Sequence, residues 1–507
     1  MASCALHCSP PGCTRGVCSE GGIRLSLEIQ TVRGISWSGI SQVVSQGFQF
    51  LVKILLARLL VPEDFGILGM ALVFTMLIET VNDVGLSAAI IQKKGITERH
   101  LSTAFWVGLA LGAALFAVGL LASPSIAAFF GEPLLAPIIV VLSLNFIFGS
   151  FGIVHRTLLM KRIDFRKIAA TEVWTAGIGG VVSLVLAFLG YGVWSLVFGS
   201  VLAILGSSAL LWVLCPWRPQ RSPDRESFLD LFGYGRNAMA SQVLGYIGSN
   251  IDYFLIAKFL DATSLGLYTL AFQMAVFPFS RVSRIIGRVT FPAFSAIQDD
   301  TRQIIRGYLK TVRYTSLLTF PMLAGLAVVA PVFIPLAIGE KWAPMVLPLQ
   351  ILSVYGILKS VEANANPVLM GMGRPDLYVR YEILSLPTIS LAIYLGMGAG
   401  ITGVAAAVTL AFCGLFFVIQ TIANRIIGLN YAALAGALLP AAVGSGVMVA
   451  AVRAFLMISE GWIPGGVALV SAIVLGALVY TGVIMVVDGG TVEEMKSVIR
   501  RISGVSA

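Results

Sequence analysis

Charged residues are scarce in this sequence: Asp, Glu, Lys and Arg make up 12% of its 507 residues, against roughly 25% in a soluble domain. Hydrophobic residues make up 57%, so a soluble domain is not expected. The three histidines are scattered, no His-x-x-x-His occurs, and there is no Gly-x4-Gly-Lys-Ser/Thr loop. These absences argue against a catalytic centre, a cofactor and ATP hydrolysis by this chain.

Cysteine is also rare, and four of the six residues crowd the N-terminus as Cys4, Cys8, Cys13 and Cys18. A zinc site usually uses paired cysteines at fixed spacing. Here the gaps are irregular and the surroundings rich in Pro, Gly and Ser. We expect a disordered tail, or a start codon assigned too far upstream, rather than a metal site.

About fourteen apolar stretches follow one another, each of about 20 residues and long enough to cross about 30 Å of hydrocarbon. Spans of a β-barrel would be about 10 residues long with alternating polarity, which is not the pattern. We predict an all-α polytopic membrane protein. Its spans lie near 35–56, 66–91, 102–123, 134–155, 168–189, 191–214, 235–257, 264–288, 312–338, 344–370, 378–397, 400–424, 431–452 and 462–487.

Positive charge follows the topology of these spans. Most of the 34 Lys and Arg residues lie in the two tails and in the loops after even-numbered spans. Loops rich in Lys and Arg stay in the cytoplasm, so both termini are predicted to be cytoplasmic. The net charge of +9 is therefore a topological signal, and no nucleic-acid partner is expected. The first thirty residues contain no apolar run long enough for a signal peptide, so the first span is predicted to direct insertion.

An internal repeat divides the chain. The segment Ala57–Ala71 recurs in diverged form as Ala257–Ala271, and Gly131-Glu132 recurs as Gly339-Glu340. Six predicted spans separate the copies, so equivalent helices run in the same direction. This predicts a parallel repeat with its pseudo-twofold axis along the membrane normal, as in transporters built from two bundles around a central cavity.

The predicted organisation follows from the repeat and the composition. A Pro- and Arg-rich connector separates the bundles, and a short amphipathic surface helix over 298–313 is expected to lead into the ninth span. The predicted parts are a disordered cytoplasmic tail (1–33), an N-terminal six-helix bundle (34–214), a cytoplasmic linker (215–234), a C-terminal six-helix bundle (235–425), two additional transmembrane helices (426–488) and a cytoplasmic tail (489–507).

Two polar stripes lie within the membrane. The first span carries Gln42, Gln46, Gln49 and Lys53 at spacings that place them on one helical face. The stripe recurs on the matching seventh span. Such stripes either form interhelical hydrogen bonds or face a water-filled cavity, and their recurrence favours the cavity. The recurring residues are Gln242, Tyr246, Ser249 and Tyr253, with Asn250 and Asp252 nearby.

Charges concentrate on the second and eighth spans. The second carries Glu79 and Asp83; the eighth carries Arg281, Arg284 and Arg288 on one face. Arg288 is expected to snorkel to the cytoplasmic surface. Arg281 lies deeper and needs an anion, either one of these carboxylates or a phosphate of the substrate.

Further charges lie on other spans. Lys53 and Asp252 are candidates for a pair between the bundles. Lys359 and Glu362 are spaced as an intrahelical pair, and the Asn-rich segment ending at Pro367 suggests a broken helix. Glu79, Asp83, Asp252 and Glu362 are candidates for gating or for carrying protons or sodium.

Several short sequence segments resemble motifs of one family, the polysaccharide-transporter flippases of the multidrug/oligosaccharidyl-lipid/polysaccharide (MOP) exporter superfamily. The resemblance covers roughly 31–425, and the Cys-rich head departs from it. It is carried by Ala57–Gly66 (Ala-Arg-Leu-Leu-x-Pro-Glu-Asp-Phe-Gly), Thr103–Trp106, Phe130–Pro133, Gly190–Leu196, Gly339–Pro344 and Gly373–Asp376.

The resemblance implies a flippase that moves an undecaprenyl-diphosphate-linked oligosaccharide across the bacterial cytoplasmic (inner) membrane by alternating access. Exopolysaccharide, capsule or O-antigen (lipopolysaccharide) units would be the cargo, with membrane lipids around it and a polymerase and glycosyltransferases as further partners. Arg281, Lys53, Lys359 and Arg284 are the candidates for diphosphate. The glutamines of the first span, Gln242, Tyr246 and Asn250 would line the cavity.

Two alternatives stay open. A cation-coupled multidrug antiporter of the same superfamily should have a net acidic cavity, whereas the candidate groups here are mixed. A membrane-embedded glycosyl-transferring enzyme would carry a large external loop with clustered acids or histidines, and none is evident. We therefore expect a transporter and not an enzyme.

Overall fold

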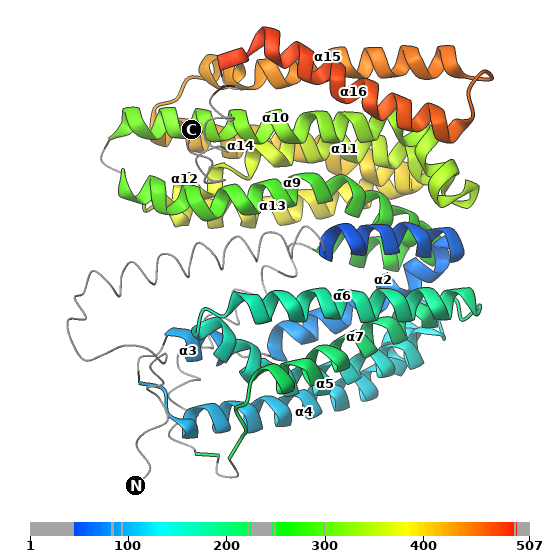
Figure 1. Cartoon of the computed structure of the whole chain (residues 1–507), viewed down its shortest axis with the longest axis vertical. Coiled ribbons are helices and arrows are strands. Elements are labelled where there is room, and N and C mark those ends of the chain that lie inside the picture. Colours follow the sequence, from blue (N-terminus) through cyan, green and yellow to red (C-terminus); the bar gives the residue numbers. More distant parts are fainter. Residues whose placement is uncertain are drawn as a thin grey trace, which may run out of the picture.

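The computed structural model describes residues 45–82, 86–92, 95–220, 223–224, 246, 250–297, 300–490 and 493. These residues form helices, and no strand occurs among them. Two groups of helices lie one above the other, and a further pair of helices forms a layer above the upper group (Figure 1).

The first group follows the N-terminal part of the chain. Within it α4 packs against α5, α6 against α7 and α5 against α7. A helix over 45–59 opens the group. It is followed by α2 (Pro62–Asn82), α3 (Leu86–Gln92), α4 (Glu98–Phe130), α5 (Leu135–Lys161), α6 (Phe165–Phe188) and α7 (Val193–Leu214).

The second group begins with a helix over 250–259. In it α10 packs against α11, α13 against α14 and α11 against α14. Its elements are α9 (Ala262–Ala296), α10 (Thr301–Phe333), the π-helix η1 (Ile334–Ile338), the 3-10 helix η2 (Glu340–Met345), α11 (Val346–Glu362), α12 (Ala365–Gly371), α13 (Pro375–Gly396), the 3-10 turn η3 (Met397–Ala399) and α14 (Gly400–Ile427).

The last two helices form a layer against the second group. α15 (Tyr431–Ser459) and α16 (Gly465–Val487) pack against each other and against α10, and form the orange and red layer of Figure 1. Arg313 of α10 forms a bidentate ion pair with Asp488, which follows α16. The distances are 2.7 Å from Nε to Oδ2 and 2.5 Å from Nη2 to Oδ1. The Tyr480 hydroxyl donates to the Leu317 carbonyl at 2.7 Å.

Local sequence explains where several helices begin. The Asp261 carboxylate accepts from the Ser264 backbone N–H at 2.6 Å, which caps α9. Asp300 caps α10 in the same way through Gln303, at 3.1 Å. Each cap satisfies a backbone donor that has no partner inside the helix.

The two groups meet where α2 crosses α9. Their backbones touch at Gly66 and Gly266, where a Cβ on Gly66 would lie 1.7 Å from the Ala262 oxygen. Only glycine allows this approach. Buried Leu56, Ala57, Leu265 and Tyr268 belong to one continuous core that joins the halves at this crossing.

The helical membrane class is confirmed: ten helical stretches in the described part of the chain are long and apolar enough to cross a membrane. One of them, Pro375–Ile427, contains both α13 and α14. The count of fourteen and the domain boundaries stay predictions, because the spans expected near 35–56, 66–91 and 235–257 lie partly outside the described residues. Both tails lie outside them almost entirely.

Two local predictions have definite outcomes. The predicted break in the tenth span is confirmed, since α11 ends at Glu362 and α12 begins at Ala365. The amphipathic segment predicted over 298–313 is helical from Thr301 and leads into the ninth span, but it is the first part of that span's helix and does not form a short helix of its own. Thr301–Phe333 is a single helix, because the amphipathic turns after the Asp300 cap continue into the apolar span without a helix-ending residue.

Candidate functional site

A cavity of about 420 Å³ lies where the helix over 45–59 meets α2, α6, α7 and α9; we call it the central cavity. Because α9 belongs to the second group and the other walls to the first, the cavity lies between the two halves. Most of its walls are apolar. Its polar lining consists of Gln49, Lys53, Thr175, Ser183, Ser200, Thr269 and Gln273.

Lys53 is the one charged residue among the described residues that line the central cavity. Its Nζ donates to Gln273 Oε1 on α9 at 2.5 Å, so the bond links the two halves. Among the described lining residues there is no carboxylate. An amine between apolar walls attracts an anion more strongly than the same amine in water.

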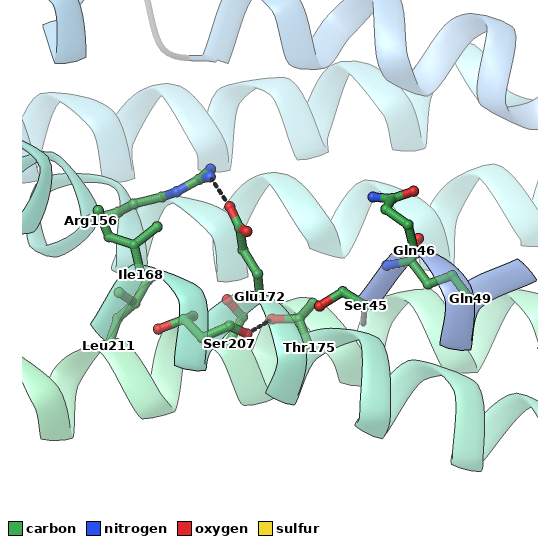
Figure 2. A pocket seen from close by; sticks show the side chains of 10 residues that line it. Ser45, Gln46, Gln49, Arg156, Ile168, Glu172, Thr175, Ser207 and Leu211 are labelled. Atoms are coloured by element: carbon green, nitrogen blue, oxygen red, sulfur yellow. Dashed lines mark hydrogen bonds and ion pairs between the residues drawn. The ribbon is translucent and has the colours of Figure 1, made fainter. Parts of the chain in front are cut away.

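A second cavity of about 280 Å³ adjoins the first, and we call it the Arg156 cavity. Gln49 and Thr175 line both cavities, so the two are neighbours along the same helices. Figure 2 shows the polar side chains that converge on it. Its lining consists of Ser45, Gln46, Gln49, Arg156, Ile168, Thr171, Glu172, Thr175, Ser207 and Leu211.

Arg156 and Glu172 form an open ion pair at this cavity. Arg156 Nη2 lies 3.5 Å from Glu172 Oε1, and the side chains are 51% and 33% exposed. This geometry is loose and solvated, so the pair itself contributes little stability. Either group can therefore exchange its partner for a ligand.

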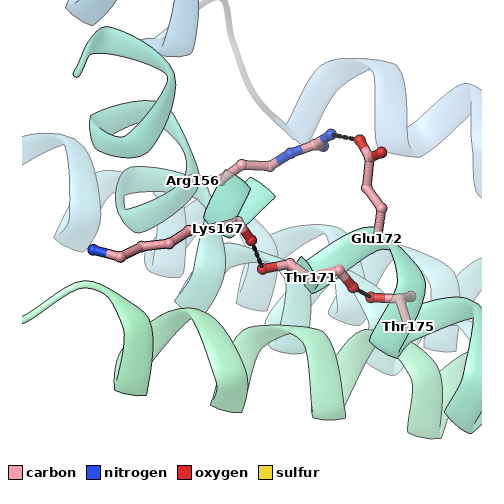
Figure 3. A network of polar contacts seen from close by, with 5 residues as sticks. All are labelled: Arg156, Lys167, Thr171, Glu172 and Thr175. Carbon is pink, nitrogen blue, oxygen red and sulfur yellow. Dashed lines mark hydrogen bonds and ion pairs between the residues drawn. The ribbon is translucent and has the colours of Figure 1, made fainter. Parts of the chain in front are cut away.

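Hydroxyl groups on α6 are oriented by the helix itself. Thr171 donates to the Lys167 carbonyl at 2.9 Å and Thr175 donates to the Thr171 carbonyl at 2.7 Å (Figure 3). With its hydrogen committed to the backbone, each oxygen keeps its acceptor capacity for a donor in the cavity. The hydroxyls of a carbohydrate are such donors.

A glycine brings the first helix against α6. A Cβ on Gly180 would lie 2.8 Å from the Phe48 ring and 2.9 Å from a Val52 methyl. The close contact holds the stripe with Gln46, Gln49 and Lys53 against the hydroxyl-bearing face of α6. The sequence thereby builds one polar surface from two helices.

No group of three or more His, Cys, Asp and Glu that could hold a metal ion occurs among the residues the structure describes.

Comparison with known proteins identifies the family. Residues 55–347 match the family described as polysaccharide biosynthesis protein. The chain belongs to this family. It is 32% identical over 390 residues to the lipopolysaccharide biosynthesis protein WzxC of Escherichia coli, which covers 75% of this chain and 78% of WzxC. The family predicted from the sequence motifs is thus confirmed.

Solved structures show the fold of this polysaccharide biosynthesis family member. The lipid II flippase MurJ, in an inward closed conformation, superposes with a TM-score of 0.71 at 15% identity, covering 90% of this chain and 99% of MurJ. An inward-facing MATE multidrug resistance transporter of the MOP superfamily superposes with a TM-score of 0.62 at 16% identity, covering 75% and 94%. The predicted MOP fold is confirmed.

The structure places three residues of the first predicted stripe at these cavities, whereas Tyr246 and Asn250 of the second line neither. Gln46 lines the Arg156 cavity, Gln49 lines both, and Lys53 lines the central cavity. On the other half, the Tyr246 hydroxyl donates to the Val73 carbonyl of α2 at 3.1 Å, and Asn250 donates to the Tyr246 carbonyl at 2.9 Å. Gln42 and Gln242 lie outside the described residues.

The predicted charged residues are distributed over several places. Glu79 is exposed on α2. Asp252 is buried and accepts from the Tyr268 hydroxyl at 3.4 Å. Arg281 and Arg284 belong to α9, and their side chains, like the whole of Asp83, lie outside the described residues.

Lys359 and Glu362 form the predicted intrahelical pair, with 2.8 Å between Nζ and Oε2. Glu362 is buried, and the Lys359 amine lies 5.0 Å from the centroid of the Phe412 ring. Lys359 lines neither of the two cavities above. Its contact with diphosphate stays a prediction.

Several lining residues were missed from the sequence. The fourth span is predicted to end near 155, which leaves Arg156 in the loop that follows, whereas α5 continues to Lys161 and keeps Arg156 within the helix. Thr171, Glu172 and Thr175 occur at helical spacing within the fifth span, the same signal that marks the first span. Gln273 has no comparable signal.

Proposed function

We propose that the chain is a flippase that carries an undecaprenyl-diphosphate-linked oligosaccharide across the membrane by alternating access, and not an enzyme. Membership of the polysaccharide biosynthesis family supports this cargo class. So does the likeness to a protein named for lipopolysaccharide biosynthesis. The product would serve exopolysaccharide, capsule or O-antigen synthesis.

The observation that carries the proposal is the Lys53 amine, held in an apolar-walled cavity between the two halves and hydrogen-bonded across them to Gln273. A diphosphate offers several anionic oxygens. They can accept hydrogen bonds from the Lys53 amine, in place of Gln273 Oε1, and from the side-chain amide N–H groups of Gln273. Binding would exchange a bond between the halves for bonds to the cargo. The negative charge of the cargo would thereby break a hydrogen bond that holds the two halves together.

The Arg156 cavity would receive the sugars and make the first contact with the anion. Its amide and hydroxyl groups match carbohydrate donors and acceptors, and Arg156 suits a phosphate. Gln46 and Lys53 are seven positions apart on one helix, roughly 10 Å along its axis. Cargo entering at Arg156 would reach Lys53 by moving along the face that carries Gln49.

We place the protein in the bacterial cytoplasmic membrane with both termini in the cytoplasm. The concentration of Lys and Arg in alternate loops supports this orientation. The Arg156 cavity then lies toward the cytoplasm and the crossing of α2 and α9 toward the outside. Membrane lipids surround the chain, and a polymerase and glycosyltransferases are proposed as further partners.

The remaining predicted residues keep their proposed roles. Arg281 and Arg284 would add positive charge to the cavity from the eighth span. The carboxyl groups that would support gating or ion coupling are Glu79, Asp83, Asp252 and Glu362.

A cation-coupled multidrug antiporter is the alternative function. The fold alone allows it, since a MATE transporter shares it. A cationic drug, however, requires an acidic site, and the described lining of the central cavity contains a lysine and no carboxylate. The charge of the cavity therefore favours an anionic cargo.

The test is complementation of a strain from which the gene has been deleted. We expect loss of surface polysaccharide and accumulation of the lipid-linked precursor. Wild type and Lys53→Arg should restore the polymer, whereas Lys53→Met, which keeps the length and removes the charge, should not. Normal polysaccharide and precursor in the deletion strain, with no redundant flippase present, would overturn the proposal and favour the antiporter.

A further inference from the structure

The contacts at the α2 and α9 crossing form a reciprocal arrangement. At Gly66 an added Cβ would lie 1.7 Å from the Ala262 oxygen, and at Gly266 it would lie 1.8 Å from the Pro62 oxygen. Each glycine thus receives a backbone carbonyl from the first turn of the opposite helix. Any side chain at either position forces the two helices apart.

Basic side chains cross between the halves beside these glycines. Arg58 donates through Nη1 to the Leu336 carbonyl at 2.8 Å and to the Ala337 carbonyl at 3.3 Å. Lys258 donates to the Phe129 carbonyl at 2.6 Å, and its amine lies 3.8 Å from the centroid of the same ring.

The carbonyls that accept these bonds lie near helix ends. Phe129 is in the last turn of α4, and Leu336 and Ala337 belong to η1, which continues α10. Carbonyls at a helix C-terminus lack intrahelical donors and carry the negative end of the helix dipole. Cationic side chains are therefore the favourable partners.

The second half also caps the end of the first helix. Trp342 is fully buried, donates through its indole N–H to the Ala57 carbonyl at 2.7 Å, and packs edge-on against Phe65. Lys341 donates to the Arg58 carbonyl at 2.8 Å.

The arrangement follows the internal repeat. Arg58 and Gly66 of the first copy correspond to Lys258 and Gly266 of the second. Each copy supplies a basic residue and a glycine, and each basic residue reaches a helix end in the other half. Figure 1 shows α2 and α9 at the junction of the two groups.

We propose that these four residues are the outer gate of the transporter: Arg58 and Lys258 lock the two halves, and Gly66 and Gly266 allow their backbones to close. The inference rests on the proposed alternating-access function and on the orientation that places this end outside. Opening toward the outer leaflet breaks both basic contacts and separates the glycine crossing. The lock acts on backbone carbonyls, so positive charge and reach are what it requires of the basic residues.

The gate is tested by the accessibility of the central cavity from outside. The reporter is Ser200→Cys, a lining position, labelled with a membrane-impermeant maleimide in intact cells. Labelling of the chain without the reporter is subtracted to remove the native cysteines. We expect slow labelling in the reporter protein and at least about tenfold faster labelling when Arg58→Ala and Lys258→Ala are combined. The double substitution removes hydrogen bonds from two charged donors and so destabilises the closed state.

Glycine variants provide an independent arm. Gly66→Ala and Gly266→Ala should also accelerate labelling, whereas Gly149→Ala, where an added Cβ meets nothing within 4 Å, should not. Arg58→Lys with wild-type Lys258 should stay near the slow rate. The amount of protein in the membrane is measured for each variant, and the basic-residue variants leave the packed glycines intact.

Unchanged external labelling in the Arg58→Ala, Lys258→Ala protein would overturn the gate. Labelling does not depend on the cargo, so this result would leave the proposed function standing if the deletion strain still loses polysaccharide. Faster labelling together with normal polysaccharide in the deletion strain would support the gate and reject the proposed cargo.

Discussion

Substitutions at Arg156 and Glu172 are expected to change cargo binding in opposite directions, although the two side chains form one ion pair. Arg156 is proposed to bind the diphosphate, and Glu172 lies 3.5 Å from it and competes with the phosphate. Removing the arginine removes a charge-assisted bond to the cargo. Removing the negative charge of the glutamate frees the arginine for it.

The magnitudes follow from exposure. A hydrogen bond to a charged group contributes about 1.5–3 kcal/mol, so Arg156→Ala should weaken binding roughly 10- to 100-fold. The ion pair is 51% and 33% exposed, and such pairs are worth about 0–1 kcal/mol. Glu172→Gln should therefore tighten binding by up to about fivefold.

The assay is titration of the detergent-solubilised protein with undecaprenyl diphosphate, followed by intrinsic tryptophan fluorescence. Lys167→Ala is the matched control, because Lys167 pairs with Asp164 at 3.2 Å near the start of the same helix and does not line the cavity. The reasoning is refuted if Arg156→Ala and Glu172→Gln shift the affinity in the same direction. A purely structural ion pair would give that result.

Two further predictions concern packing. Gly180→Ala should lower the apparent melting temperature in detergent, because the added Cβ would lie 2.8 Å from the Phe48 ring and overpacking costs about 1–3 kcal/mol. Gly108→Ala is the control and should not, because a Cβ on Gly108 meets nothing within 4 Å; equal losses would contradict the close contact between α6 and the first helix. Arg313→Ala and Asp488→Ala should each destabilise the protein by about 2–3 kcal/mol, below the range for fully buried pairs because Arg313 is 35% exposed. Their double variant should cost less than the sum, and strict additivity would show that the pair does not couple α10 to the end of α16.

The family, the helical class and the repeat were predictable from the sequence. Membrane spans are long apolar runs, which are visible in a single sequence. The two copies of the repeat still share similar segments, such as Ala57–Gly66 and its counterpart two hundred residues later. The stripe of Gln46, Gln49 and Lys53 was also readable, because helical spacing alone puts three polar residues on one face. Which of these residues line a cavity required the structure.

Contacts between distant segments could not be read from local patterns. Lys53 meets Gln273, and Trp342 meets the Ala57 carbonyl, only because α2 and α9 cross at two glycines. Arg156 was misplaced for a different reason. A cluster of basic residues near a span end predicts a cytoplasmic loop, and the helix instead extends through the first of them.

The most direct measurement of the central claim is flipping by the purified protein in liposomes. A fluorescent undecaprenyl-diphosphate oligosaccharide is placed in both leaflets, and its accessibility to a membrane-impermeant reducing agent is followed. Wild type and Lys53→Arg should expose the inner-leaflet cargo, and Lys53→Met should do so at least about tenfold more slowly, as expected for a lost charge-assisted bond. Equal rates for wild type, Lys53→Met and protein-free liposomes would contradict the account.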